Sequence, residues 1–197
     1  MHEFLPGLSR LELPKMYGVG QRFDPDHIAD VESAARAQLE RLEIDTIIRS
    51  ARTIALAVGS RGIANIAAIV RTTVAHLQRV GIDVFIVPAM GSHGGATAVG
   101  QVELLEHFGI TEQSVGAPIR SSMEAIEIGS VQSRHGNDVK LYMDAIAHGE
   151  ADLVVPINRI KPHTGFKGQV ESGICKMLVI GLGKQAGADK IHQQALR

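Results

Sequence analysis

Two strand–loop–helix units follow each other in the sequence, and this alternation limits the chain to a small set of folds. The run RTIALAVG at 52–59 is short, branched and apolar, as in a buried parallel strand, and a helix-spaced apolar pattern follows at 65–81. The run DVFIVPA at 83–89 and the stretch QVELLEHFG at 101–109 repeat this order. Each helical stretch ends at a glycine that can form a C-terminal cap. Because parallel strands need such crossover helices, the pattern predicts an α/β fold.

The segments after these units add a hairpin and a third strand. MEAIEIGSVQS at 123–133 and VKLYMDAI at 139–146 flank the turn-forming run RHGND, and ADLVVPIN at 151–158 is another apolar strand. We therefore predict a Rossmann-like α/β fold, with a mainly parallel sheet flanked by helices and a β-hairpin excursion.

The first 50 residues carry weaker patterns. PKMYGVGQRF at 14–23 is compatible with a strand edge. Asp24 and Pro25 form a helix start for the amphipathic stretch at 26–42. We therefore expect a helix, and no more than an edge strand, before the first strand–loop–helix unit.

Charge and cysteine content exclude several classes of function. The chain has 197 residues, 20 basic and 21 acidic, and its formal charge of −1 argues against nucleic-acid and membrane-surface partners. The single cysteine, Cys175, rules out an intrachain disulfide and a cysteine-rich metal site built by this chain alone. No apolar run approaches the roughly 18 residues of a membrane span, and the N-terminus lacks the pattern of a secretion signal. We expect a soluble, cytoplasmic protein.

Three loops follow the predicted parallel strands, at the edge where ligands bind in open α/β sheets. They are GSRG at 59–62, GSHGG at 91–95 and NRIKPH at 158–163. Each loop contains a side chain that can bind an anion or move a proton. In the first two loops this side chain stands among small residues, and in the third it stands beside Asn and Pro. Taken singly the loops are weak evidence, since a histidine such as His93 also caps helices and Arg61 is equally compatible with a surface cation. Their expected convergence is what points to a site.

Known nucleotide and zinc motifs do not account for the glycines and histidines near the end of the chain. GLGKQAG has three residues between Gly183 and Gly187, where a dinucleotide fingerprint has two. A Walker phosphate loop would need glycine at Leu178 and Ser or Thr at Gln185. The His-Glu-x-x-His pattern of zinc hydrolases does not occur around His192.

The motifs taken together nevertheless resemble those of a known family. GSRG, PAMGSHGGAT, KPHTGF, SGICKMLVIGLGKQAGA and a later histidine occur in the order found in the lactate racemase family, the nickel-pincer-nucleotide-dependent 2-hydroxyacid racemases and epimerases. The resemblance covers residues 52–192. It implies that residues 1–197 form the N-terminal catalytic and cofactor-binding α/β domain of this type. It also implies that the second, C-terminal domain is absent from this chain, and that the chain alone has little activity.

The resemblance implies a covalent cofactor and its metal ligand. Lys176 would carry a nickel-pincer nucleotide, the nickel complex of pyridinium-3,5-bisthiocarboxylic acid mononucleotide, through a thioamide. His192, sixteen positions later, would bind the nickel. The apolar residues around Lys176 in the sequence favour a desolvated, neutral amine, although a helix-edge lysine with its ammonium in solvent is the alternative.

Catalytic roles follow from the same resemblance. His93 and His163 would move the substrate hydroxyl proton, one for each enantiomer, and Arg61 would hold the substrate carboxylate. Further cofactor contacts are implied at Ser60, Gly94, Gly95 and Phe166.

The substrate class and the partners are expectations of the same kind. Lys167, Gln169 and Glu171 stand where lactate-specific members look more glycine-rich, so a larger or more acidic 2-hydroxy acid is at least as well favoured as lactate. Cofactor-synthesis and nickel-insertion proteins are the expected protein partners, and a homo-oligomer is compatible with this interpretation.

Two other functions stay open, as do the environments of several residues. One is a pyridoxal-phosphate-type lysine enzyme, and the other is a non-catalytic module that binds an anion or nucleotide. For Lys161, Lys167 and Lys184, a solvent-exposed position is as well favoured as a functional one. Cys175 is expected to be a small buried core residue.

Overall fold

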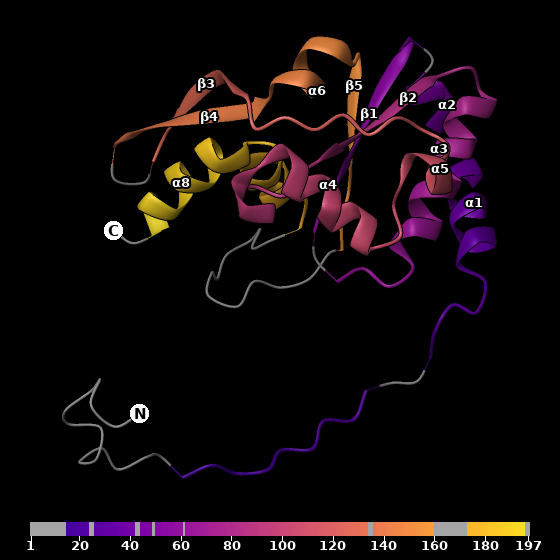
Figure 1. Cartoon of the computed structure of the whole chain (residues 1–197), viewed down its shortest axis with the longest axis horizontal. Helices are drawn as coiled ribbons and strands as arrows, with labels where there is room; N and C mark the ends of the chain where they lie inside the picture. The colour runs from indigo at the N-terminus through magenta and orange to yellow at the C-terminus, as the bar shows by residue number, and fades with distance from the viewer. Residues whose placement is uncertain are drawn as a thin grey trace.

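A three-stranded parallel sheet lies at the centre of the fold in the computed structural model (Figure 1). β1 (Thr53–Val58) pairs with β2 (Asp83–Pro88) on one side and with β5 (Leu153–Ile157) on the other. The strands predicted at 52–59, 83–89 and 151–158 are therefore confirmed. The structure describes residues 15–23, 26–41, 44–48, 50–60, 62–133, 136–159 and 173–195.

The middle strand is buried on both faces, which explains its continuous apolar sequence. Ile54 and Leu56 pack into one cluster with residues of α3, while Ala55 and Ala57 point the other way, into a cluster with Phe85. All four β1 side chains are fully buried. Because successive side chains of a strand alternate between the faces of the sheet, one run of apolar residues serves two cores. Together with the strand pairing, this confirms the predicted α/β fold with a mainly parallel sheet.

Helices cover the two faces of the sheet unequally. α3 (Ile66–Arg79), α4 (Ala98–His107) and α5 (Glu112–Val115) contribute to the first cluster, and α1 (Val31–Arg41) packs on the outer side of α3. α2 (Ile44–Ile47) links α1 to β1. The second cluster draws on α6 (Ala145–Glu150) and on Met177 and Leu182 near the end of the chain. Figure 1 shows α1, α3 and α5 on one side of the sheet and α8 on the other.

The predicted glycine caps end both crossover helices. At the end of α3, the Gly81 amide donates to the Gln78 carbonyl at 3.0 Å and the Ile82 amide to the Leu77 carbonyl at 3.1 Å. The same pair of bonds recurs after α4, from Gly109 and Ile110. This is the Schellman arrangement, which satisfies the last carbonyls of a helix. α4 itself begins at Ala98 rather than at Gln101, because the Thr97 side chain accepts from the Gly100 amide and caps it.

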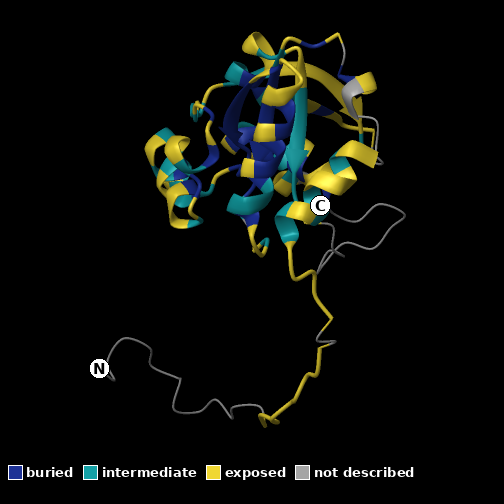
Figure 2. Cartoon of the chain, turned by 90° about the vertical axis from the view of Figure 1, so that its right-hand side faces the viewer, coloured by how far each residue is buried: buried dark blue, intermediate teal, exposed yellow. Residues whose placement is uncertain are grey.

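The N-terminal predictions are partly wrong. Residues 15–23, where a strand edge was expected, have no regular secondary structure and are exposed (Figure 2). α1 begins at Val31, where the Asp30 carboxylate accepts from the Ser33 amide at 3.0 Å. Asp30 is therefore the cap of this helix. The cap that the sequence suggested, Asp24 with Pro25, lies outside the described residues.

The hairpin is confirmed, and an unpredicted helix follows it. β3 (Ala125–Gln132) pairs antiparallel with β4 (Asp138–Asp144), with an irregularity between Glu127 and Gly129. α6 starts directly after β4 because the Asp144 side chain accepts from the Ala147 amide at 2.8 Å. Asp144, the last residue of β4, is therefore also the N-terminal cap of α6.

The C-terminal apolar block forms three consecutive helical pieces. These are α7 (Ile174–Lys176), the π-helical turn η3 (Met177–Gly181) and α8 (Lys184–Ala195). α8 packs against β4, under the hairpin. π-Helical turns are rare and occur often at functional sites, so this segment is a place to look for chemistry.

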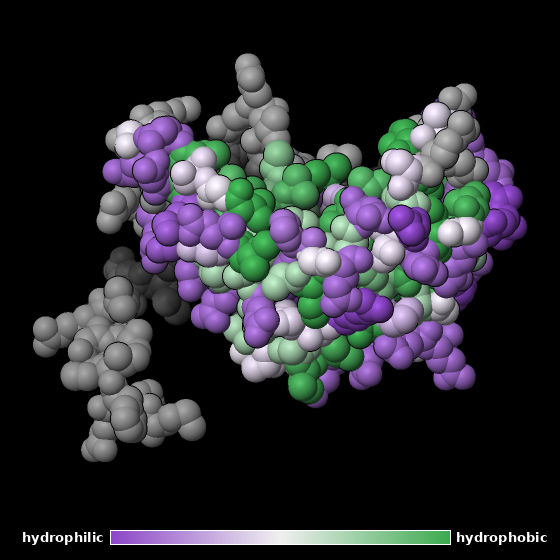
Figure 3. All heavy atoms as spheres, turned by 90° about the horizontal axis from the view of Figure 1, so that it is seen from above, coloured by the Kyte–Doolittle hydropathy of each residue, from purple (hydrophilic) through white to green (hydrophobic). Residues whose placement is uncertain are grey.

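The surface of the described residues is mixed. Small hydrophobic and hydrophilic groups of residues alternate on the face seen in Figure 3. Among the described helices, none has the length and apolar content needed to cross a membrane.

The Asp152 carboxylate ties the start of β1 to the start of β5, and this contact predicts a pH-dependent stability. It accepts from the backbone amides of Arg52 at 2.7 Å and Thr53 at 3.0 Å, and these bonds hold the pKa of Asp152 below its ordinary value. A lowered pKa stabilises the fold above the ordinary pKa of aspartate, and this stabilisation is lost as the pH falls through the lowered value. Asp152→Asn should therefore lower the urea midpoint at about pH 7 and have little effect at about pH 3.

Asp83→Asn, at an exposed carboxylate on β2, is the control and should leave the midpoint unchanged at both pH values. Equal losses for Asp152→Asn at both pH values would show that the charge of the carboxylate is irrelevant.

Candidate functional site

The carboxyl ends of the three parallel strands lie side by side, as the loop argument requires. Val58 at the end of β1 is in register with Pro88 of β2 and with Ile157 of β5. The loops that carry Ser60 and His93 and the segment that begins at Asn158 therefore leave the same edge of the sheet. Three site residues predicted from the sequence, Arg61, His163 and Phe166, lie outside the described residues.

The structure brings Ser60 and His93 into direct contact. The Ser60 hydroxyl oxygen and His93 Nδ1 are 2.5 Å apart, in a partly buried position. The two residues are 33 positions apart in the sequence, so this contact depends on the pairing of β1 with β2. A hydroxyl that donates to Nδ1 fixes the tautomer of the ring and leaves Nε2 protonated, while the opposite tautomer leaves Nε2 as the acceptor. In both cases the orientation of the imidazole is restrained.

The two glycines that follow His93 differ in what surrounds them. A Cβ atom at Gly94 would lie 2.5 Å from the carbonyl carbon of Gly100, so this glycine is needed for the packing of the loop on α4. At Gly95 a Cβ atom would meet nothing within 4 Å, and the residue is exposed. Of the two, Gly95 is the one that leaves space for a ligand.

The segment after Lys176 packs closely against both loops. A Cβ atom at Gly59 would lie 3.1 Å from the Met177 sulfur, and the Gly91 amide donates to the Gly181 carbonyl at 3.2 Å. The helical turn that follows Lys176 is therefore in contact with the loops that carry Ser60 and His93.

The expected apolar surround of Lys176 is not present in the described structure. Lys176 is exposed, and its apolar neighbours Ile174 and Leu178 are themselves 48% and 46% exposed. Cys175 is also exposed, so the prediction that it is a buried core residue is wrong. The helical arrangement explains both results, because Gly173 and Met177 take the inward positions and residues 174–176 between them face outward.

His192, the predicted metal ligand, is exposed on α8. Within the described residues, no group of three or more His, Cys, Asp or Glu side chains has the arrangement of a metal site. A metal bound here by protein groups alone would need ligands from elsewhere, whereas a cofactor that brings its own donors needs a single imidazole.

A buried ionic network lies next to this site, and the sequence analysis did not identify it. The Lys184 side chain is fully buried, with Nζ 2.7 Å from Asp144 Oδ2. Nζ also donates to the Pro88 carbonyl at 2.7 Å, and Gln101 Oε1 lies 3.4 Å away. Burial lowers the pKa of Lys184, and the attraction of the Asp144 carboxylate opposes this shift.

The position of Lys184 in the sequence contains one signal that could have revealed its burial. Met177, Gly181, Lys184 and Ala188 are all buried and recur in the sequence at the i, i+4, i+7, i+11 spacing typical of a helix face, although the structure divides them between η3 and α8. Its partner Asp144 is 40 positions earlier and cannot be found from local pattern.

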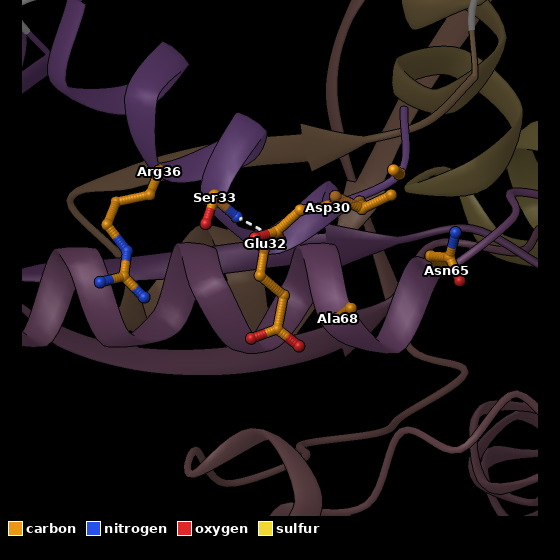
Figure 4. A pocket seen from close by; sticks show the side chains of 8 residues that line it. Asp30, Glu32, Ser33, Arg36, Asn65 and Ala68 are labelled. Carbon is orange, nitrogen blue, oxygen red and sulfur yellow. Dashed lines mark hydrogen bonds between the residues drawn. The ribbon is translucent and has the colours of Figure 1, made fainter. Parts of the chain in front are cut away.

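A separate cavity lies between α1 and the first turn of α3. It has a volume of about 380 Å³ and contains none of the predicted site residues. Asp30, Glu32 and Ser33 line it from the start of α1, and Asn65 and Ala68 from the start of α3 (Figure 4). Asp30 already caps α1, and its hydrogen bonds to Ser33 lower the pKa of its carboxyl group. Asp30 is thus explained by helix capping, and Glu32 by its ion pair with Arg71.

Comparisons of the chain with models of known protein families, with curated proteins and with solved structures gave no match. The functional argument therefore stands on the residues themselves. They supply an oriented imidazole at the carboxyl edge of the sheet, an accessible glycine beside it, and an exposed amine on an adjoining segment. Such a set can bind a small molecule and exchange a proton with it.

Proposed function

We propose that the chain is the proton-transfer and cofactor-binding domain of a 2-hydroxyacid racemase or epimerase of the lactate racemase type. The observation that carries this proposal is the 2.5 Å contact between Ser60 and His93, which joins two of the predicted loops at the carboxyl edge of the sheet. A racemase of this class must remove a proton from the substrate hydroxyl and later return it. An imidazole held in one orientation is suited to both steps.

The chemistry asked of His93 is simple. The ring accepts the hydroxyl proton of one enantiomer as the 2-hydroxy acid becomes a planar 2-keto acid, and in the reverse direction it donates the proton that restores this enantiomer. Ser60 holds the ring, and the tautomer in which Nδ1–H donates to the Ser60 hydroxyl leaves Nε2 as the proton acceptor. The resemblance assigns the same task for the other enantiomer to His163 and carboxylate binding to Arg61, so both are parts of this proposal.

The exposed residues are compatible with the implied cofactor. The nickel-pincer nucleotide would be held by the Lys176 amine and the His192 imidazole, both of which are accessible. Gly95, two positions after His93, is exposed, and a Cβ atom there would meet nothing within 4 Å. When bound, the cofactor supplies hydride transfer at the substrate carbon. Because it brings two sulfur donors and one carbon donor, a single protein imidazole completes a square-planar nickel site.

His93→Ala is the decisive test of this function. In protein produced together with the cofactor-synthesis and nickel-insertion proteins, the low turnover of 2-hydroxy acids expected of this chain alone should fall further, by roughly 10²-fold or more, because the base assigned to one enantiomer is lost. Nickel content and the increase in mass caused by the cofactor should stay unchanged. Racemisation is measured by chiral chromatography over a panel that includes lactate, sugar acids and hydroxy diacids.

His148→Ala, at an exposed histidine on α6, is the matched control and should leave turnover unchanged. Binding of a hydroxy acid without turnover in the loaded parent protein would instead favour the anion-binding module. An absorption spectrum typical of a lysine-bound pyridoxal would favour the pyridoxal-phosphate enzyme.

A further inference from the structure

One buried ammonium group connects four parts of the fold. Lys184 Nζ lies 2.7 Å from the Pro88 carbonyl at the end of β2 and 2.7 Å from Asp144 Oδ2 at the end of β4. Gln101 Oε1 of α4 is 3.4 Å away. Lys184 itself is the first residue of α8. A single side chain thus holds the C-terminal helical segment against the sheet, the hairpin and α4.

Gln101 extends this connection to the loop that carries His93. Its side chain is fully buried, and Nε2 donates to the Gly91 carbonyl at 2.9 Å and to the His93 carbonyl at 3.3 Å. The amide oxygen of Gln101 faces Lys184 and its amide nitrogen faces the loop. The result is a chain of polar contacts from Lys184 through Gln101 to the backbone of His93.

Burial of the Lys184 and Asp144 charges costs free energy of folding, so their presence in the core needs a reason. A buried charge is tolerated only when it is paired. Asp144 Oδ2 accepts no well-aligned hydrogen bond from the described residues, so the positive charge of Lys184 is what compensates the burial of the Asp144 carboxylate. The Lys184 backbone also has φ +53°, in the left-handed region that non-glycine residues rarely occupy. Backbone strain of this kind persists where the surrounding structure fixes it, and it clusters at functional sites.

The same unit also positions the segment next to the predicted cofactor lysine. Lys184 follows η3, whose Gly181 carbonyl accepts from the Gly91 amide, two residues before His93. The ammonium group therefore fixes the His93 loop through Gln101, and through the Lys184 backbone it fixes residues 174–181, here called the Lys176 segment.

We propose that Lys184 and Gln101 form a positioning unit that sets His93 relative to the Lys176 segment. The inference rests on the proposed function only in treating His93 as the proton-transfer group. Neither residue is assigned contact with the substrate. They act through the backbone of the loop and through α8.

Gln101→Met tests the unit in the full-length chain. The substitution keeps the size of the side chain and removes both amide contacts, while the Lys184–Asp144 pair remains. The imidazole signals of His93, assigned in a histidine carbon–proton NMR spectrum by their loss in His93→Gln, should shift, and those of His148 should stay in place. In the loaded protein, kcat should fall roughly 10-fold with little change in KM, because a displaced base weakens the reaction more than binding.

Two further variants separate positioning from folding. Gln193→Met, at an exposed glutamine of α8, should leave the His93 signals and kcat unchanged. The double variant Lys184→Met with Asp144→Asn removes the ammonium group without leaving a buried charge unpaired, and it should shift the His93 signals as Gln101→Met does.

Unchanged His93 signals in folded Gln101→Met protein would overturn the proposal, even if the variant unfolds at a lower urea concentration. A shift of these signals in a protein that turns over no hydroxy acid would support the positioning unit and contradict the proposed function. Loss of turnover in His93→Ala, together with normal signals and turnover in Gln101→Met, would support the proposed function and contradict the positioning unit.

Discussion

Lys176→Ala should remove the covalent adduct completely from protein produced together with the cofactor-synthesis and nickel-insertion proteins. A thioamide needs the amine of this one side chain, and its exposure on α7 makes it accessible to a large nucleotide. Intact mass should show the parent protein heavier than the unloaded chain by the pincer nucleotide plus nickel, less the water lost when the thioamide forms, and Lys176→Ala without this increase. Peptide mapping of the parent should locate the adduct on the peptide that contains Lys176.

Two companion variants make this result specific. Lys190→Ala, at an exposed lysine of α8, should keep the full adduct. His192→Ala should keep the organic part and lose most of the nickel, because it removes the one imidazole assigned to the metal. An adduct on Lys161, Lys167 or Lys184 would refute the assignment of the tether even if the family resemblance holds.

The parallel sheet and its crossover helices were predictable because their patterns are local. Each strand run is short and apolar, and each helix has its own spacing and its own C-terminal glycine. The hydrogen bonds after Gly81 and Gly109 show that these glycines act as expected. The convergence of the loops that carry Ser60 and His93 followed from the same logic, since adjacent parallel strands bring their following loops together, but the contact between these two side chains was not itself predicted.

The N-terminal helix shows where local signals compete. Asp24 with Pro25 and Asp30 are both acceptable starts in the sequence. Asp30 forms the cap because its carboxylate reaches the Ser33 amide, and the helix that follows packs on α3. Which of two caps is used depends on where the helix finds its packing partner, and this is not encoded within the helix itself.

Lys176 was expected to be buried and is exposed, whereas Lys184 is buried. This difference has a similar origin. An apolar run from Ile174 to Ile180 suggested a buried amine at Lys176, but only one face of a helix is buried. Lys176 lies on the exposed side of α7, whereas Lys184 begins a separate helix, α8, at a buried position. The charge of Lys184 then requires Asp144, which stands on a different strand, so neither its burial nor its partner follows from composition.

The largest stability effect should come from breaking the Lys184–Asp144 pair on one side only. Lys184→Met leaves the Asp144 carboxylate buried without its cation, and it also removes the donor to the Pro88 carbonyl. We expect the free energy of unfolding to fall by about 3–5 kcal/mol, as measured by urea denaturation near neutral pH. Asp144→Asn should cost somewhat less, because an amide keeps an acceptor for the Ala147 amide at the start of α6.

A double-mutant cycle separates the pair from its surroundings. Lys184→Met with Asp144→Asn should be more stable than the sum of the two single losses predicts, by about 1–3 kcal/mol, because removal of the second charge relieves the burial penalty left by the first. Lys190→Met, at an exposed lysine on the same helix, should change the free energy of unfolding by less than about 0.5 kcal/mol. Strictly additive losses would mean that the two charges do not stabilise each other. The strained backbone of Lys184 would then need another cause than the anchoring of its side chain.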